Sequence, residues 1–219
     1  MQALPSNPFV HHVIFGVAGF FKQLPKGVLH FHGFSVSKMN DFITVNAIVL
    51  RAVDYKEFDR ILTIYSLEHG KLSANAAGVK KPKAKLKHAA QPLVFGEFDL
   101  MPTKAGHRLM TARPIDTFFD IHKNIEAYFA AAAVLELADI FATETADPQL
   151  FLLVVNTVKD LTYGTRAAKD ITAEFLTEFL KISGYGVQEN ASLRLLALRC
   201  EEHAERKLKA LSAFLSMAA

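Results

Sequence analysis

Five lysines lie within a span of eight residues near the middle of the chain, with no acid among them: Lys80, Lys81, Lys83, Lys85 and Lys87. A lysine ammonium neutralises a phosphate without reading a base, so such a row suits a polyanion such as nucleic acid. A run of like charges is also typical of a plain solvated loop, because the charges repel one another and stay in water. Here the lysines directly follow a strand-turn-strand pattern, so a folded sheet would present them at one edge. This placement favours a polyanion-binding loop over a disordered tail, and we expect the loop to be flexible.

Other residues of this region extend the candidate site. Aromatic rings that point outward can stack on bases, and Phe42, Tyr55 and Tyr65 are the candidates. For Tyr65 we favour burial in a core, whereas for Tyr55 burial and stacking are equally good interpretations. If the lysines are not the site, three cations on the neighbouring strands come next: Arg60, Lys71 and Arg108.

Residues that catalyse reactions or hold metals do not combine into a motif. The sequence has no GxxxxGK[ST], GxGxxG, HExxH or GxSxG pattern, and these are the signatures of common phosphate-binding, dinucleotide-binding and hydrolytic sites. Glu97 and Asp99 share a face of an expected strand, where we interpret them as solubilising acids. Cys200 and His203 supply two of the four ligands that a structural zinc needs. We therefore expect no enzyme, no cofactor and less than about one tenth of an equivalent of bound zinc. The remaining imidazoles lie where no ordered element is expected to fix them: His11, His12, His30 and His32.

The charge is unevenly distributed along the chain. Residues 39–114 carry twelve Lys and Arg against seven Asp and Glu, whereas residues 115–219 carry ten against fifteen. A basic half joined to an acidic half indicates a nucleic-acid surface on one and a different role for the other. The single cysteine excludes a disulfide framework and indicates a reducing compartment, the cytoplasm. The apolar run at residues 13–21 is shorter than the roughly 20 residues that a membrane span requires.

The pattern of apolar residues predicts an α+β protein. Short runs with β-branched residues and Gly-containing turns predict five antiparallel strands, and five short strands suit a small closed barrel, an OB-fold. We expect the strands at residues 42–53, 60–66, 72–77, 93–101 and 107–112, the last ending before Arg113 and Pro114.

Beyond Pro114 the apolar period becomes that of helices. We expect helices over residues 120–143, over 150–161 after an Asp147-Pro148 start, from Asp170 to Gly184, and one long helix from a cap at Asn190 to Phe214. The domain organisation that we predict is an N-terminal extension at 1–38 that the core does not need, with Met39 as the true start, then an OB-fold domain at 39–114 and a helical domain at 115–219.

An ordered series of short motifs resembles the bacterial RecO family of DNA repair proteins. Each motif alone is weak, but their order is specific, and the resemblance covers residues 39–188. The motifs are AIVL at 47–50, YxExDRILT at 55–63, GK at 70–71, GxKKPK at 78–83, LEL at 135–137, LFLL at 150–153, and FL at 179–180 followed by GY at 184–185.

The resemblance implies a DNA repair and recombination mediator without catalytic turnover. Such proteins bind single- and double-stranded DNA, anneal complementary single strands, and help to load the RecA recombinase onto DNA coated by single-strand-binding protein, together with RecR. It implies a cytoplasmic, nucleoid-associated protein that needs no membrane. Many members hold zinc with four cysteines after the Gly-Tyr position, whereas this chain has only Cys200 and a short tail, so we expect no zinc.

Three functions remain open at this point. The first is the DNA-annealing mediator, the second is an OB-fold scaffold that binds protein rather than DNA, and the third is a small metal-dependent enzyme. For the tail of the single-strand-binding protein, which pairs acids with a terminal apolar residue, we expect an apolar groove in the acidic half with a cation at its rim. Arg166 and Lys169 are the candidate cations.

Overall fold

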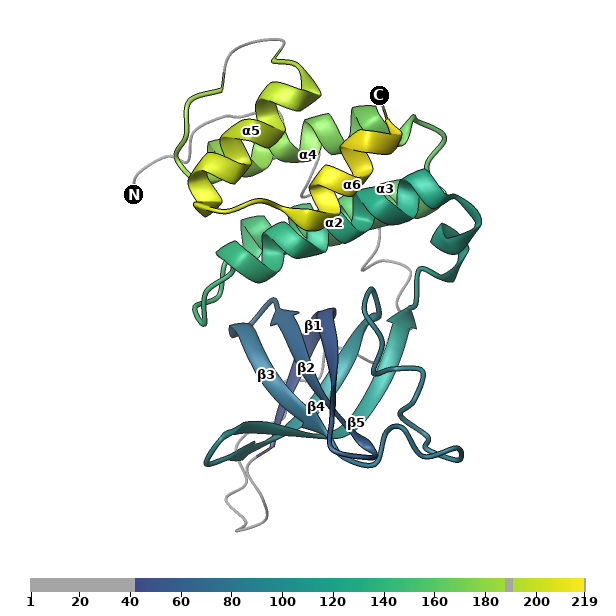
Figure 1. Ribbon diagram of the computed structural model, residues 1–219. Coiled ribbons are helices and arrows are strands. Elements are labelled where there is room, and N and C mark those ends of the chain that lie inside the picture. Colours follow the sequence, from purple (N-terminus) through teal and green to yellow (C-terminus); the bar gives the residue numbers. More distant parts are fainter. Residues whose placement is uncertain (1–41, 188–190, 219) are drawn as a thin grey trace, which may run out of the picture. The chain divides into compact units, whose positions relative to one another are not determined.

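A computed structural model describes residues 42–187 and 191–218. Five strands close into a barrel in the order β1-β2-β3-β5-β4 (Figure 1). All neighbouring pairs are antiparallel except β3 and β5, which run parallel. The predicted five-stranded OB barrel is therefore confirmed. The strands are β1 (Ile43–Tyr55), β2 (Asp59–Ser66), β3 (Gly70–Ala76), β4 (Phe95–Thr103) and β5 (Gly106–Asp116).

The pairing of β1 with β4 and of β3 with β5 closes the barrel, and alternate residues of its strands point inward. The residues that fill the interior include Val45, Val49, Leu62, Ile64 and Phe98, which are fully buried. The register of β1 shifts between Val49 and Arg51, a bulge that bends the strand. One strand can therefore pair with β4 through its first half and with β2 through its second half.

The last strand is longer than the sequence predicted. We expected it to stop before Arg113 and Pro114, but β5 continues to Asp116. Pro114 lies opposite Gly96, where the register between β4 and β5 shifts. A proline is tolerated in a strand at such a bulge, because the ladder there does not need its missing N–H group.

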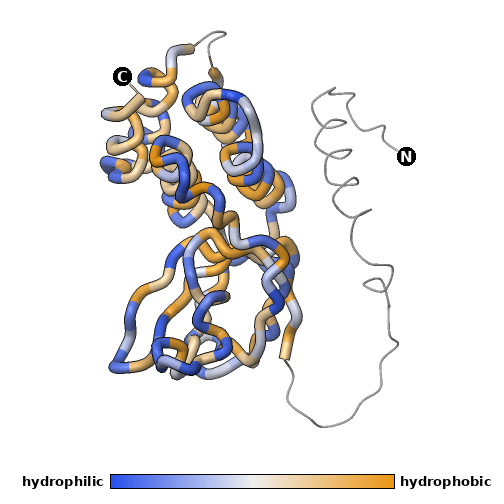
Figure 2. Tube along the Cα trace, turned by 90° about the vertical axis from the view of Figure 1, so that its right-hand side faces the viewer, coloured by the Kyte–Doolittle hydropathy of each residue, from blue (hydrophilic) through white to orange (hydrophobic). Residues whose placement is uncertain are grey.

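The helical region follows the barrel and begins with a short 3-10 segment, which replaces the first turn of the helix that we expected from residue 120. Side-chain caps fix the starts of three helices: Asn124 accepts from the N–H of Ala127, Asp147 from that of Leu150, and Ser192 from that of Leu195. The elements are η1 (Phe119–Lys123), α2 (Ile125–Phe141), α3 (Pro148–Tyr163), α4 (Ala168–Ile182), α5 (Leu193–Ala204) and α6 (Lys209–Met217). Figure 2 shows apolar and polar stretches alternating along these elements, as expected where each buries one face.

Our prediction of a single long C-terminal helix is wrong. The chain forms two helices instead, and α5 ends at Ala204, which is followed by Glu205 with a left-handed backbone, φ 52°. The carboxylate of Glu136 on α2 accepts from the N–H groups of Lys209 and Ala210 at 2.9 and 2.8 Å, so a tertiary contact caps the start of α6. The expected cap Asn190 lies outside the described residues, and α4 begins at Ala168, two residues before the predicted Asp170.

The barrel packs directly on the helical region, and the two belong to one compact unit of the described residues. The hydroxyl of Tyr65 donates to the carbonyl of Asp147 at 3.1 Å, and its ring meets the edge of Phe151. The N–H of Lys71 donates to the carbonyl of Thr143 at 2.7 Å. The boundary at residue 114 stays a prediction, and the predicted extension at 1–38, with its histidines and the start at Met39, lies outside the described residues. Among the helices that the structure describes, none is long and apolar enough to cross a membrane.

Candidate nucleic-acid interface

The five lysines lie on the connection between β3 and β4, residues 77–94, which we call the lysine loop. Successive backbone hydrogen bonds, such as those from Ala84 to Lys81 and from Lys87 to Ala84, fold the loop into turns. Apolar residues of the loop contribute to the barrel core: Val79, Ala90 and Val94 are buried there, and Leu86 packs against it. The loop is therefore held against the barrel, unlike the flexible segment that the sequence suggested.

The turn between β1 and β2 fastens one side of the lysine loop. The N–H of Lys80 donates to the carbonyl of Phe58 at 2.9 Å, and the N–H of Gly78 donates to Asp59 Oδ1 at 2.7 Å. Arg60 Nη1 donates to the carbonyl of Ala90 at 3.2 Å, near the other end of the loop. These bonds fix the place from which the lysine side chains project.

Asp54 at the end of β1 ties two of the candidate cations together. Its Oδ1 lies 2.9 Å from Arg60 Nε, and its Oδ2 lies 2.9 Å from Lys80 Nζ. Hydrogen bonds from Lys80 and then Arg60 hold the pKa of Asp54 below its usual value. Lys80 and Arg60 therefore hold the loop in place, and only part of their charge is available to a ligand.

The remaining four lysines of the loop, Lys81, Lys83, Lys85 and Lys87, are exposed. Lys81 Nζ lies 5.6 Å from the centre of the Phe58 ring. Within the described part of the chain, the ammonium groups of Lys83, Lys85 and Lys87 have no ion-pair partner. A row of exposed cations on an ordered backbone can bind the phosphates of a nucleic-acid strand without having to order the loop, and the cations stay largely hydrated.

The other two candidate cations lie elsewhere on the barrel. Lys71 Nζ donates to the carbonyl of Asp139 at 2.7 Å in the last turn of α2, where the helix dipole favours a cation. Arg108 is exposed on β5 beside Asn75 of β3, next to the strand end from which the lysine loop leaves. Arg108 thus borders the candidate surface, whereas Lys71 joins the barrel to the helices.

The three aromatic candidates differ in how far their side chains are exposed. Tyr65 is fully buried, as we favoured, while Tyr55 and Phe42 are 44% and 58% exposed. Phe58 was not among the predicted candidates, although it is 39% exposed and lies beside Lys81. The sequence Tyr55-Lys56-Glu57-Phe58 between two expected strands could have indicated an exposed aromatic residue, because turns favour small polar residues rather than aromatic ones.

The two candidate metal sites have structural roles instead. Arg113 Nε donates to Glu97 Oε1 at 2.6 Å, and Arg113 Nη2 and Thr44 Oγ1 both donate to Asp99 Oδ1. Asp99 is only 7% exposed, so our interpretation of the pair as solubilising surface acids is wrong: the two acids belong to an ion cluster on the barrel wall.

The cysteine and histidine of α5 also have packing roles rather than metal-binding ones. Burial raises the pKa of the Cys200 thiol to about 12, which disfavours the thiolate that binds metals. The ring of His203 stacks on Phe141 and contacts Tyr185. The described segments contain no group of three or more His, Cys, Asp and Glu side chains able to hold a metal ion.

The comparisons with known proteins agree on one family. The model "Recombination protein O N terminal" matches residues 39–118, and "Recombination protein O C terminal" matches residues 122–195. The curated DNA repair protein RecO of Heliobacterium modesticaldum is 35% identical over 109 residues, which cover 50% of this chain and 40% of that protein. The RecO protein of Acetivibrio thermocellus is 30% identical over 146 residues (66% and 58%), and that of Bacillus subtilis is 34% identical over 119 residues (54% and 47%).

The matched part of the chain spans about half the length of these curated relatives. The N-terminal model covers the barrel with its lysine loop, and the C-terminal model covers the helical region from η1 to the start of α5. The chain belongs to the RecO family of DNA repair proteins.

Proposed function

We propose that this protein binds single-stranded and double-stranded DNA through the lysine loop and anneals complementary single strands, without catalytic turnover. The observation that carries the proposal is the set of four exposed lysines on a loop fixed to the barrel by backbone and side-chain hydrogen bonds. Lysines bind phosphates whatever the base sequence. An annealing protein needs this property, because it must hold two strands of any sequence close together while their bases pair.

The mediator role extends this proposal to protein partners. In it, the chain acts with RecR on DNA coated by single-strand-binding protein and so prepares the DNA for the RecA recombinase. Such a protein acts at chromosomal DNA, in the nucleoid of the cytoplasm. The support for these partners is membership of the family, together with a basic barrel joined to an acidic helical region.

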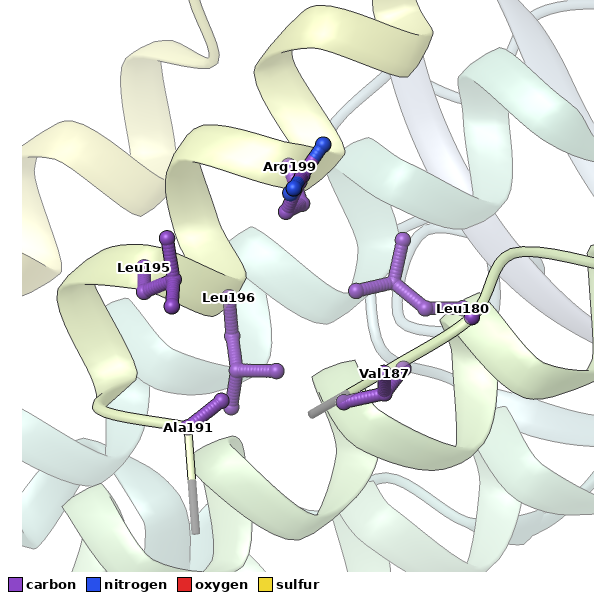
Figure 3. Close-up of a pocket in the computed structure, with 7 residues that line it drawn as sticks. Leu180, Val187, Ala191, Leu195, Leu196 and Arg199 are labelled. Carbon is purple, nitrogen blue, oxygen red and sulfur yellow. The ribbon is translucent and has the colours of Figure 1, made fainter. Parts of the chain in front are cut away.

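A small pocket in the helical region has the chemistry that the tail of single-strand-binding protein requires. Figure 3 shows Leu180, Val187, Leu195 and Leu196 around this pocket between α4 and α5, with Arg199 one turn further along α5. An apolar end group of the tail would contact the leucines, and an acid of the tail would pair with the guanidinium of Arg199 in place of Glu202, whose Oε2 lies 3.4 Å from Arg199 Nη1. Arg166, one of the cations that we expected at such a groove, is bound to Glu174 at 2.6 Å and is not among the residues that line this pocket.

We expect the substitution Arg199→Glu to weaken binding of the tail peptide roughly tenfold, since it places a like charge against the acids of the peptide. Arg166→Glu is the matched control, because it makes the same charge change on an exposed arginine outside the pocket. Fluorescence anisotropy of a labelled peptide measures both. Equal losses in the two variants would show that only net charge matters and would remove the pocket from consideration.

The alternative is a scaffold whose barrel binds protein and not DNA. Both functions fit the fold, but a row of exposed lysines, three of which have no acidic partner among the described residues, favours a polyanion. An annealing assay with complementary oligonucleotides coated by single-strand-binding protein tests the proposal. We expect the protein to raise the annealing rate at least tenfold at about 0.1 M salt, and an unchanged rate together with salt-independent partner binding would favour the scaffold.

A further inference from the structure

Two aromatic side chains are exposed beside the lysine loop, at the turn between β1 and β2. Tyr55 is 44% exposed and Phe58 is 39% exposed. Each ring has an ammonium beside it: Lys56 Nζ lies 5.2 Å from the centre of the Tyr55 ring, and Lys81 Nζ lies 5.6 Å from that of Phe58. Each of the two exposed rings thus has an exposed cation against it.

The barrel core does not account for the position of Phe58. Its carbonyl accepts the N–H of Lys80 at 2.9 Å, so the backbone of the turn is fixed to the lysine loop while the ring projects from it. A single exposed apolar residue is ordinary on a protein surface. Two exposed rings, each within 6 Å of a lysine ammonium at the edge of a phosphate-binding row, form a more specific arrangement.

A nucleotide presents a flat base and an anionic phosphate joined by a short sugar. Protein sites for single-stranded nucleic acid accordingly combine cations that follow the backbone with aromatic rings on which successive bases stack. Phe58 and Lys81 offer these two groups side by side, since a lysine that rests on a ring in water can turn toward a phosphate without leaving the site. The contact that Lys81 would give up is weak at an exposed position.

We propose that Phe58, together with Tyr55, is a stacking platform for unpaired bases that gives the lysine loop a preference for single strands over duplex. The inference rests on the proposed DNA-binding function and adds to it the feature of the ligand that is recognised. In a duplex the faces of the bases are covered by their neighbours, so a duplex can use the lysines but not the rings. The lysines therefore supply affinity for any DNA, and the rings supply the preference for exposed bases.

The test compares Phe58→Leu with the unaltered chain on three probes of equal length: oligo-dT, the same backbone with abasic sites throughout, and a duplex. Leucine keeps the apolar character of the side chain but removes the flat face. We expect affinity for oligo-dT to fall roughly tenfold, affinity for the abasic strand and the duplex to stay within about twofold, and the salt dependence to remain unchanged. Tyr55→Leu is expected to act in the same direction, with a smaller effect. Phe119→Leu is the matched control, because Phe119 is 70% exposed but lies on η1, outside the barrel loops.

Each other outcome overturns the inference in a recognisable way. Equal losses on the three probes would mean that Phe58 only holds the lysine loop in place. An unchanged affinity for oligo-dT would mean that no base stacks there. If the unaltered chain bound none of the probes, the proposed DNA-binding function itself would fail, a result that does not depend on the Phe58 variant.

Discussion

Replacing the four exposed lysines of the loop, Lys81, Lys83, Lys85 and Lys87, with glutamine is expected to weaken binding of single-stranded DNA by roughly 10²- to 10³-fold at 0.1 M salt. Each phosphate neutralised on a single strand contributes about −0.7 to the slope of log affinity against log salt concentration. Losing three or four such contacts should therefore flatten the slope by about 2 to 3 units. Binding titrations at several salt concentrations, on oligonucleotides of different sequence, measure both quantities.

Lys80 is left out of this variant because its side chain is bound to Asp54. A matched control removes four exposed cations from the helical region: Lys169, Arg194, Arg206 and Lys209, each to glutamine. It has the same net charge as the test variant, so an equal effect of the two would show that overall charge, rather than the loop, binds DNA. A weaker binder with an unchanged slope would mean that the lysines act through structure. An unaffected binder would move the site to other cations, with Arg108 next.

The barrel could be predicted from the sequence because its signals are local. Alternation of apolar residues and the glycine turns are properties of a few neighbouring residues, and they gave the number of strands and most of their positions. The ends of β5 and of the C-terminal helices could not be predicted, because tertiary partners decide them. Pro114 is accommodated by a bulge opposite Gly96, and the start of α6 is set by Glu136, more than 70 residues earlier in the chain.

The candidate site, too, could be predicted from the sequence only in part. The row of lysines is visible in the sequence, but its division into anchoring and available cations depends on where Asp54 and the carbonyl of Ala90 lie in space. Lys71 was a candidate because of its charge, and only the packing of α2 against the barrel gives it a structural role. Asp99 resembled a surface acid because strand alternation does not reveal that Arg113 and Thr44 bind it.

Two glycines with nearly the same φ angle offer a test of how the barrel is joined to the helices. Gly70 begins β3 with φ +68°, and Gly78 is the second residue of the lysine loop, with φ +67°. A methyl group at Gly70 would overlap the backbone carbonyls of Thr143 and Thr145, whereas at Gly78 the nearest atoms are side-chain carbons of Lys81 at 3.8 Å. The surroundings of the two positions, and not their φ angles, should therefore decide how much an alanine costs.

We expect Gly78→Ala to lower the free energy of unfolding by about 1–2 kcal/mol, the cost of placing an ordinary side chain in the left-handed region. Gly70→Ala should lower it by about 3 kcal/mol or more, because the same strain is joined by an overlap with backbone that cannot turn aside. That overlap lies next to the hydrogen bond from Lys71 to Thr143, so relieving it must move the β2–β3 turn away from the segment between α2 and α3. Urea unfolding followed by far-UV circular dichroism measures both values, since the chain has no tryptophan. Equal losses in the two variants would show that the contact at Gly70 yields easily, and that the barrel is not held to the helices at this turn.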